Sequence, residues 1–219
     1  MKKILLVFIS CLSFACVNAQ ANEIKIKNDS LSYNLPTGFC EVKPDKAKSS
    51  EIFNFFDKSL GKSVELHTII APCKEIAEVS SGRADALNSV ILLSSIGIDG
   101  KFVKFRFGRR AYLNFMTLFK PDKLDKTMKR ANDRLKPYNV KIANLMISDP
   151  YVKNQMVNYT GNISFEYKEK KAGFDFLASS TLAKSWPIAT AVLYRNDKDI
   201  DLKKILGAYS SITEDLKKN

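Results

Sequence analysis

Apolar and polar residues alternate in short stretches along much of the chain, which is the pattern of half-buried β-strands. Residues 23–36 alternate on both sides of Asn28-Asp29 and predict a β-hairpin, and residues 63–70 predict a further strand. The C-terminal third is rich in such stretches. Strands are expected there at 140–147, 162–167, 174–181 and 188–194, with turns at Lys170–Gly173 and Trp186-Pro187.

Other segments repeat their apolar residues every three or four positions and predict helices. These helices are expected at 49–60, 74–79, 109–119, 122–136 and 199–217, the last capped by Asp199 or Asp201. Residues 85–98 are apolar almost throughout, so they fit either a buried helix or a strand followed by a turn. Residues 101–107 alternate and predict a half-buried strand with Phe105 and Phe107 in the core.

Strands at both ends of the chain, with helices early, in the middle and at the C-terminus, indicate an α+β fold. We expect an α-β-α sandwich built on a mainly antiparallel sheet. No run rich in Pro, Gly or Ser interrupts residues 22–219, and no repeat is visible in them. A single globular domain is therefore predicted over that range.

The chain begins with Lys2 and Lys3, an apolar run over residues 4–17 and the triplet Ala19-Gln20-Ala21. This order is typical of a secretory signal peptide, and the apolar run is shorter than the ~20 residues that a membrane-spanning helix needs. We expect residues 1–21 to be cleaved. The competing interpretation is a lipoprotein modified at Cys16, but Ser13 stands where bacterial lipoproteins usually carry leucine. The mature protein is then periplasmic or secreted.

Removal of the leader leaves two cysteines, Cys40 and Cys73. In an oxidising compartment two thiols usually pair, and two cysteines allow only one intramolecular bridge. A disulfide that closes the loop between residues 40 and 73 would stabilise the fold by roughly 3–4 kcal/mol in the chain-entropy model. No redox motif of the type C-x-x-C joins them, and the single histidine leaves a zinc site short of ligands. A structural disulfide is predicted.

The N-terminal hairpin running into LPTGFCEV (35–42), the second cysteine after an early strand, and the ending STLAKSWPIATAVLYRND…DLKKILGAYSSITEDLKKN resemble a family of exported bacterial proteins of unknown function. The layout is also similar, more loosely, to the α-β-α sandwich of the PsbP and Mog1 type. Members of that fold mostly bind partners or assist assembly. The resemblance implies a binding protein.

The formal net charge is +12, and most of the excess is concentrated in one segment. Residues 101–136 carry 12 basic and 3 acidic side chains, a net charge of +9. The helix expected at 122–136 surrounds a narrow apolar stripe with Lys123, Lys126, Lys129, Arg130 and Arg134. Helices of this kind bind anionic membrane surfaces. The alternative is a solvated face whose stripe packs on the sheet. Nucleic acid is not an expected partner, because an exported protein rarely meets it.

His67 is the only histidine, so a serine or cysteine hydrolase mechanism would have to use it. Alternation places it on the strand face of Glu65 and Ile69, and no nucleophile motif accompanies it. No metal or cofactor motif is present in the sequence. We therefore expect a non-catalytic envelope protein that binds a protein partner or an anionic membrane surface. Two alternatives stay open: a secreted effector that acts outside the cell, and an exported enzyme with an unrecognised site.

Overall fold

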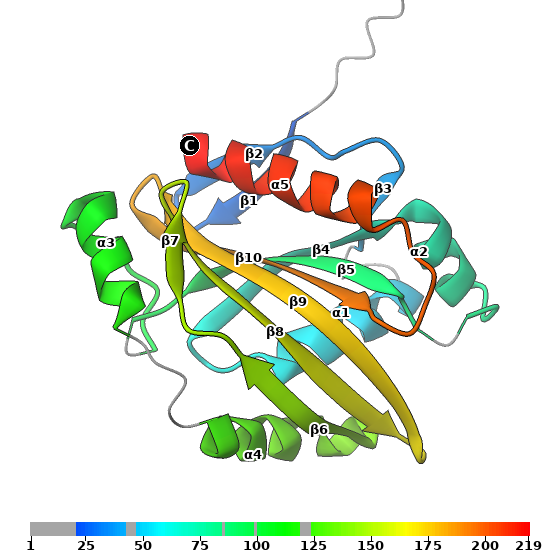
Figure 1. Ribbon diagram of the computed structural model, residues 1–219. Helices are drawn as coiled ribbons and strands as arrows, with labels where there is room; N and C mark the ends of the chain where they lie inside the picture. The colour runs from blue at the N-terminus through cyan, green and yellow to red at the C-terminus, as the bar shows by residue number, and fades with distance from the viewer. Residues whose placement is uncertain (1–20, 43–46, 85, 99, 119–123) are drawn as a thin grey trace, which may run out of the picture.

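The computed structural model describes the chain from residue 21 to residue 219 apart from 43–46, 85, 99 and 119–123 (Figure 1). Its centre is an eight-stranded sheet in the order β3-β4-β5-β10-β9-β8-β6, with β7 beside β8, and every pairing is antiparallel. The strands are β3 (Phe39–Val42), β4 (Val64–Pro72), β5 (Ser89–Ile96), β6 (Val140–Ile147), β7 (Tyr151–Lys153), β8 (Met156–Tyr167), β9 (Lys170–Ala183) and β10 (Trp186–Arg195). The α+β class with a mainly antiparallel sheet is confirmed.

One face of the sheet is covered by the N-terminal hairpin and the C-terminal helix. The hairpin pairs β1 (Asn22–Ile26) with β2 (Asp29–Tyr33) as a separate two-stranded sheet, with Ile24 opposite Leu31. Helix α5 (Leu202–Lys218) begins at Asp201, whose side chain accepts a hydrogen bond from the backbone N–H of Lys204 at 3.0 Å. The predicted cap at Asp201 is therefore present, and it satisfies one of the backbone donors at the helix start.

The other face carries the remaining helices. These are α1 (Ala47–Ser59), α2 (Cys73–Ser80), α3 (Gly108–Thr117) and α4 (Leu124–Leu135), the last followed by the short 3₁₀ helix η1 (Lys136–Tyr138). Helices α1 and α2 cover β4 and β5, α3 packs on β8 and β9, and α4 packs on β6. Layers of helix on both sides of the sheet make the expected α-β-α sandwich (Figure 1).

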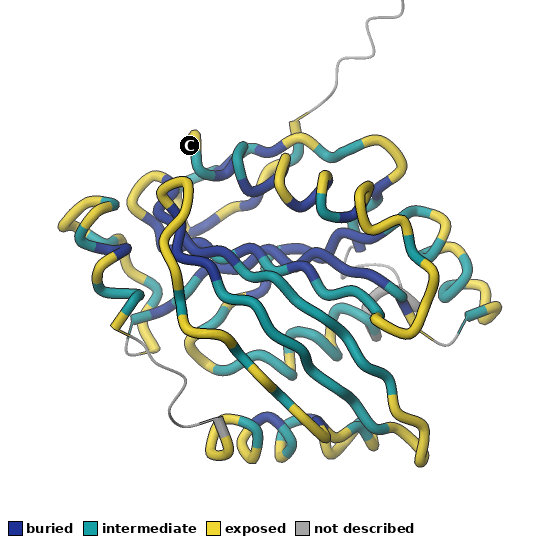
Figure 2. The backbone as a smooth tube through the Cα atoms, viewed as in Figure 1, coloured by how far each residue is buried: buried dark blue, intermediate teal, exposed yellow. Residues whose placement is uncertain are grey.

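Segment 85–98, which fitted either a helix or a strand, contains strand β5. The burial of β5 on both faces explains why its sequence did not distinguish the two. Ile91 and Leu93 face the hairpin and α5, whereas Val90 and Leu92 face α1 and α2. A strand buried on both faces has no polar side from which alternation can be recognised. Figure 2 shows this central part of the sheet as buried, while β8 and β9 are half-buried for much of their length.

The strand predicted at 101–107 is wrong. Only an isolated bridge between Ile98 and Lys101 forms there, and Phe107 is 81% exposed. The physical reason is that β5 already has neighbours on both sides, β4 and β10, so the segment after it meets no free strand edge. Phe105 instead packs its ring against Tyr112 of α3, at 5.4 Å between ring centroids.

The two predicted turns lie two residues too late. Lys168-Glu169 and Lys184-Ser185 make the tight turns, with φ between 46° and 69°, and Trp186-Pro187 already belongs to β10. Two-residue hairpin turns with positive φ at both central positions are normally signalled by Gly or Asn. Neither residue is present at these four positions, so the composition pointed to the wrong residues.

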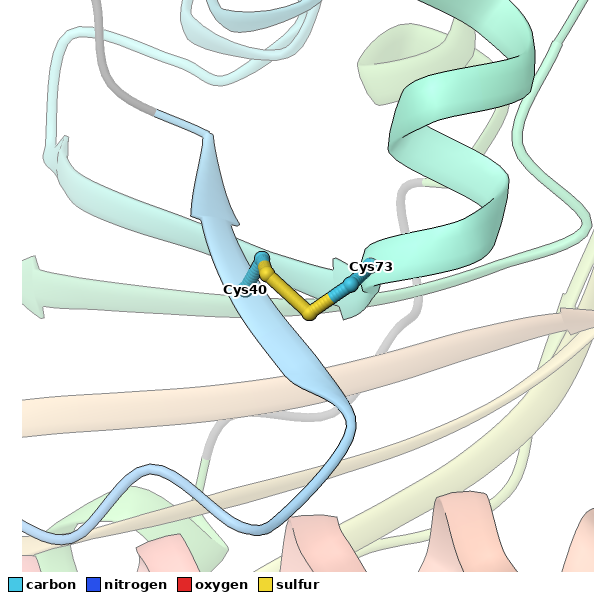
Figure 3. The surroundings of a disulfide bond; sticks show 2 residues. All are labelled: Cys40 and Cys73. Carbon is cyan, nitrogen blue, oxygen red and sulfur yellow. A yellow bond between two sulfur atoms is a disulfide. The ribbon is translucent and has the colours of Figure 1, made fainter.

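The predicted disulfide is confirmed. Cys40 of β3 and Cys73, the first residue of α2, are joined across the edge of the sheet, with 4.9 Å between their Cα atoms (Figure 3). The bond closes a loop over a separation of 33 residues and holds β3, β4 and α2 together. Disulfides persist in oxidising compartments, so the bond is compatible with an exported protein.

Candidate anionic-surface binding face

Helix α4 presents three of the predicted surface-binding cations to solvent. Lys126, Lys129 and Arg130 are exposed, whereas Lys123 lies outside the described residues. No carboxylate in the described part of the chain forms an ion pair with any of these three. Their charges are therefore free to act on a partner.

The apolar stripe of α4 is already used inside the protein. Leu135 is fully buried and Ala131 is 6% exposed, both in a cluster with Ile142 of β6. The amide of Asn132 fixes the same contact, because it accepts from the Ile142 N–H at 2.6 Å and donates to the Ile142 carbonyl at 3.2 Å. These side chains cannot also enter a membrane, so α4 offers charge alone.

Arg134 has a different role from the other cations of α4. Its guanidinium donates to the carbonyl of Lys58 at 3.2 Å and to that of Ser59 at 3.0 Å. These carbonyls end helix α1, where the last turn lacks intrahelical donors and its partial negative charge favours a cation. Arg134 thus ties α4 to α1.

The segment that leads into α3 is a second cationic region. Residues 101–118 contain five basic and no acidic side chains. Arg109 points inward, donating to the carbonyls of Leu182 and Lys217 at 2.9 and 2.8 Å. Lys104 pairs with Asp29 at 2.9 Å. Arg106 and Arg110 are exposed and make no ion pair with any described carboxylate.

Large apolar side chains stand beside these cations, and the sequence reasoning missed them. Phe107 is 81% exposed, Leu118 is 78% exposed and Val103 is 43% exposed. Phe107 and Leu118 lie eleven residues apart, which is close to three helical turns. That spacing, together with Tyr112 and Met116 on the opposite side, is the signal that could have found them. The misread strand at 101–107 hid it.

A polar cleft of about 280 Å³ lies between the hairpin and strands β3 and β4. It is lined by Glu23, Ile24, Lys25, Glu41, Val42, His67 and Thr68. A register shift between Leu66 and Thr68 turns His67 toward the hairpin face, where its Nε2 lies 3.0 Å from the Ser95 hydroxyl. The prediction that His67 shares a face with Ile69 is therefore wrong, because Ile69 packs with Leu66 on the α1 side.

The electrostatics of the cleft follow from burial. Burial lowers the pKa of His67, and the nearby charge of Glu65 opposes that shift only in part. Burial also raises the pKa of Tyr33, whose hydroxyl donates to Glu41. The neutral forms of both rings are thereby favoured near neutral pH.

The cleft lacks the parts of a hydrolytic site. Ser95, the hydroxyl beside His67, is 1% exposed and out of reach of a substrate. Across the described residues, His67 is hydrogen-bonded to Ser95, whose hydroxyl donates onward to Glu65 at 3.5 Å, so no carboxylate bonds the imidazole directly as in a catalytic triad. No group of three or more His, Cys, Asp or Glu side chains that could hold a metal is found in the described part of the chain.

Comparison with known proteins adds no name to this site. No family model matches the chain, and no curated protein matches it significantly. The resemblance to exported bacterial proteins and to the PsbP and Mog1 type stays a prediction. Considering only the residues that the structure describes, none of the helices is long and apolar enough to cross a membrane.

Proposed function

We propose that this protein is exported and acts as a non-catalytic binder of an anionic surface in the cell envelope. The observation that supports it best is a set of exposed cations that form no ion pair with any described carboxylate, on two helical regions that follow each other in the chain: Arg106 and Arg110 at α3, and Lys126, Lys129 and Arg130 on α4. Unpaired cations that share one sign attract an anionic surface before contact and hold the protein there.

The charges are numerous enough to matter. Each basic residue near an anionic lipid surface contributes about 1 kcal/mol, and every 1.4 kcal/mol is a factor of ten in affinity. Loss of three such residues is therefore expected to weaken binding by roughly a hundredfold, before the repulsion of new carboxylates is counted. Screening by salt should imitate the loss.

The test is co-sedimentation of the mature protein with vesicles of phosphatidylglycerol and phosphatidylcholine. The variant Lys126→Glu, Lys129→Glu, Arg130→Glu should bind at least a hundredfold more weakly than the wild type. It should keep its circular dichroism spectrum, because Ala131 and Leu135 are untouched.

A matched control makes the same change of charge elsewhere. Lys198, Lys203 and Lys204 are exposed where α5 begins, on the opposite face of the sheet from α4. Their replacement by glutamate should weaken binding far less, since only long-range charge is altered. Equal loss in both variants, or salt-insensitive binding by the wild type, would contradict the proposal.

A further inference from the structure

Helix α3 is held rigidly by its inner side. Tyr112 is fully buried, and its hydroxyl lies 2.5 Å from that of Ser180 in β9. Arg109 adds the bonds to the carbonyls of Leu182 and Lys217 and a third bond to the side chain of Gln155 at 3.0 Å. The orientation of the helix is therefore fixed, and its outer side is a permanent surface of the protein.

The outer side of α3 carries an exposed apolar residue at each end and exposed polar residues between them. Phe107 stands directly before the helix and Leu118 directly after it, about 16 Å apart at 1.5 Å per residue. At 3.6 residues per turn, their spacing of eleven residues predicts positions about 20° apart around the helix axis. Arg110 and Asn114 are exposed between them at helical spacing. The outer side thus has an apolar residue at each end and a cation between, with Arg106 adjoining Phe107 in the chain.

We infer that this outer side of α3 is a membrane-insertion surface: Phe107 and Leu118 enter the apolar edge of an anionic bilayer while Arg106 and Arg110 bind lipid phosphates. The inference rests on the proposed function and names the surface as a lipid bilayer. It adds an inserting contact at α3 to the charge contact of α4, whose apolar stripe is buried.

Two observations favour a bilayer over a protein partner. Residues 101–118 contain no carboxylate to repel lipid phosphates, which gives charge complementarity to an anionic membrane. Phe107 and Leu118 are also separated by three turns on a helix at the edge of the molecule (Figure 1), and the ring of Phe107 lies 5.8 Å from that of Phe105. A fluid bilayer accommodates separated anchors with cations between them, whereas a protein interface is built around a contiguous, closely packed core.

Insertion is tested directly with Phe107→Trp in the mature chain. The native Trp186 is 4% exposed and donates to Asp29 at 2.7 Å, so the wild type reports the background from a buried indole. With phosphatidylglycerol vesicles that contain brominated phosphatidylcholine, the variant should show a blue shift and quenching by bromines high on the acyl chains. The wild type should show neither.

A second variant measures the contribution to affinity. Phe107→Ser, Leu118→Ser should weaken vesicle binding by about a hundredfold at unchanged melting temperature, since each apolar side chain is worth about a factor of ten when moved from water. The control is Tyr167→Ser, Leu202→Ser, which removes two other exposed apolar side chains, 43% and 39% exposed, and should bind as the wild type does.

The outcomes separate the two proposals. Salt-sensitive binding by the wild type, without quenching in Phe107→Trp and without loss in the double serine variant, overturns insertion through α3 and leaves the proposed function standing. If the wild type does not bind anionic vesicles at all, both proposals fall.

Discussion

Helices α3 and α4 belong to the same basic part of the chain, yet their apolar residues have opposite fates. In α4 the stripe around Ala131 and Leu135 is buried against β6, and only cations face solvent. In α3 the sheet takes Tyr112 and Leu113, and Phe107 and Leu118 at the two ends are left outside. Amphipathic spacing alone does not say which partner an apolar side chain will have.

Each of the helices α3 and α4 carries one arginine that is bonded within the protein and one that is exposed. Arg134 in α4 and Arg109 in α3 both donate to backbone carbonyls of distant segments, so they stabilise the fold. Arg130 and Arg110 lie on the same helices, are exposed, and donate to no backbone carbonyl among the residues that the structure describes. Residue type and net charge do not distinguish the bonded arginines from the exposed ones. The distinction depends on whether backbone carbonyls of another segment lie within reach.

The largest expected effect tests whether the apolar residues of α4 are structural and those of α3 are not. Leu135→Ala should lower the free energy of unfolding by about 3–5 kcal/mol, because the side chain is fully buried and its removal leaves a cavity. Leu118→Ala should change it by less than about 0.5 kcal/mol, because the side chain is mostly in water. Urea unfolding measures both free energies. Equal losses in the two variants would mean that Leu118 is as structural as Leu135.

The disulfide tests whether stability and vesicle binding are independent, because it lies away from the side of α3 that we propose to face lipid. Replacing Cys40 and Cys73 with serine should cost about 3–4 kcal/mol of stability, since the unfolded chain regains the entropy of the loop. Vesicle binding well below the melting temperature should be unchanged, because α3 packs on β8 and β9 and the bond lies at β3. Calorimetry and co-sedimentation check the two halves. Weaker vesicle binding by the folded variant would contradict this independence, because it would show that the disulfide at β3 affects the surface of α3.

The third effect distinguishes the two arginines of α4. Arg134→Ala should lower stability by about 1–3 kcal/mol, because two carbonyls at the end of α1 lose a charged donor. Arg130→Ala should leave stability within about 0.5 kcal/mol but weaken vesicle binding several-fold. Paired unfolding and sedimentation curves decide between the two roles. The opposite assignment would mean that Arg134 is the surface ligand.

The smallest expected effect is a loss of stability on acidification caused by His67, and it sets the pH above which variants of α3 and α4 should be compared. Burial holds the pKa of His67 below its ordinary value of 6.5, so the unfolded chain binds more protons as pH falls from 6.5 toward the folded pKa. Stability that is fully present above pH 6.5 is therefore lost progressively on acidification. His67→Gln should flatten this slope in urea midpoints measured from about pH 7.5 to 5.5.

Four other charged groups face or adjoin His67, namely Glu23, Lys25, Glu41 and Glu65. The glutamine variant leaves all four in place, so the difference between its slope and that of the wild type reports His67. An unchanged slope in the glutamine variant would show that His67 is not desolvated in the folded protein.

Much of the architecture could be predicted because it depends on local pattern. The helices from α1 to α5 and the strands β4, β6, β8, β9 and β10 follow apolar periodicity within their own residues. The errors occurred where that pattern needed a partner or a turn of unusual composition. Residues 101–107 alternate like a strand but reach no sheet edge, and a bulge of one residue re-aimed His67.

The candidate site was predictable only in its composition. The excess of cations in 101–136 is visible in the sequence, and so are the five cations of the helix predicted at 122–136. The exposure of Phe107 was not, because alternation in this segment suggested a core position. A pattern shows that a residue is apolar, and the surrounding packing decides whether anything covers it.

The sequence by itself determined most of the helices and strands, the concentration of charge and, given the predicted cleavage of residues 1–21, which sulfur atoms could pair. Only the tertiary structure decided which cations stay free and which apolar residues face water. The physical reason is separation along the chain: Arg134 bonds to carbonyls 75 and 76 residues away and Arg109 to carbonyls 73 and 108 residues away. Contacts of that range exist only after the sheet has brought its covering helices together.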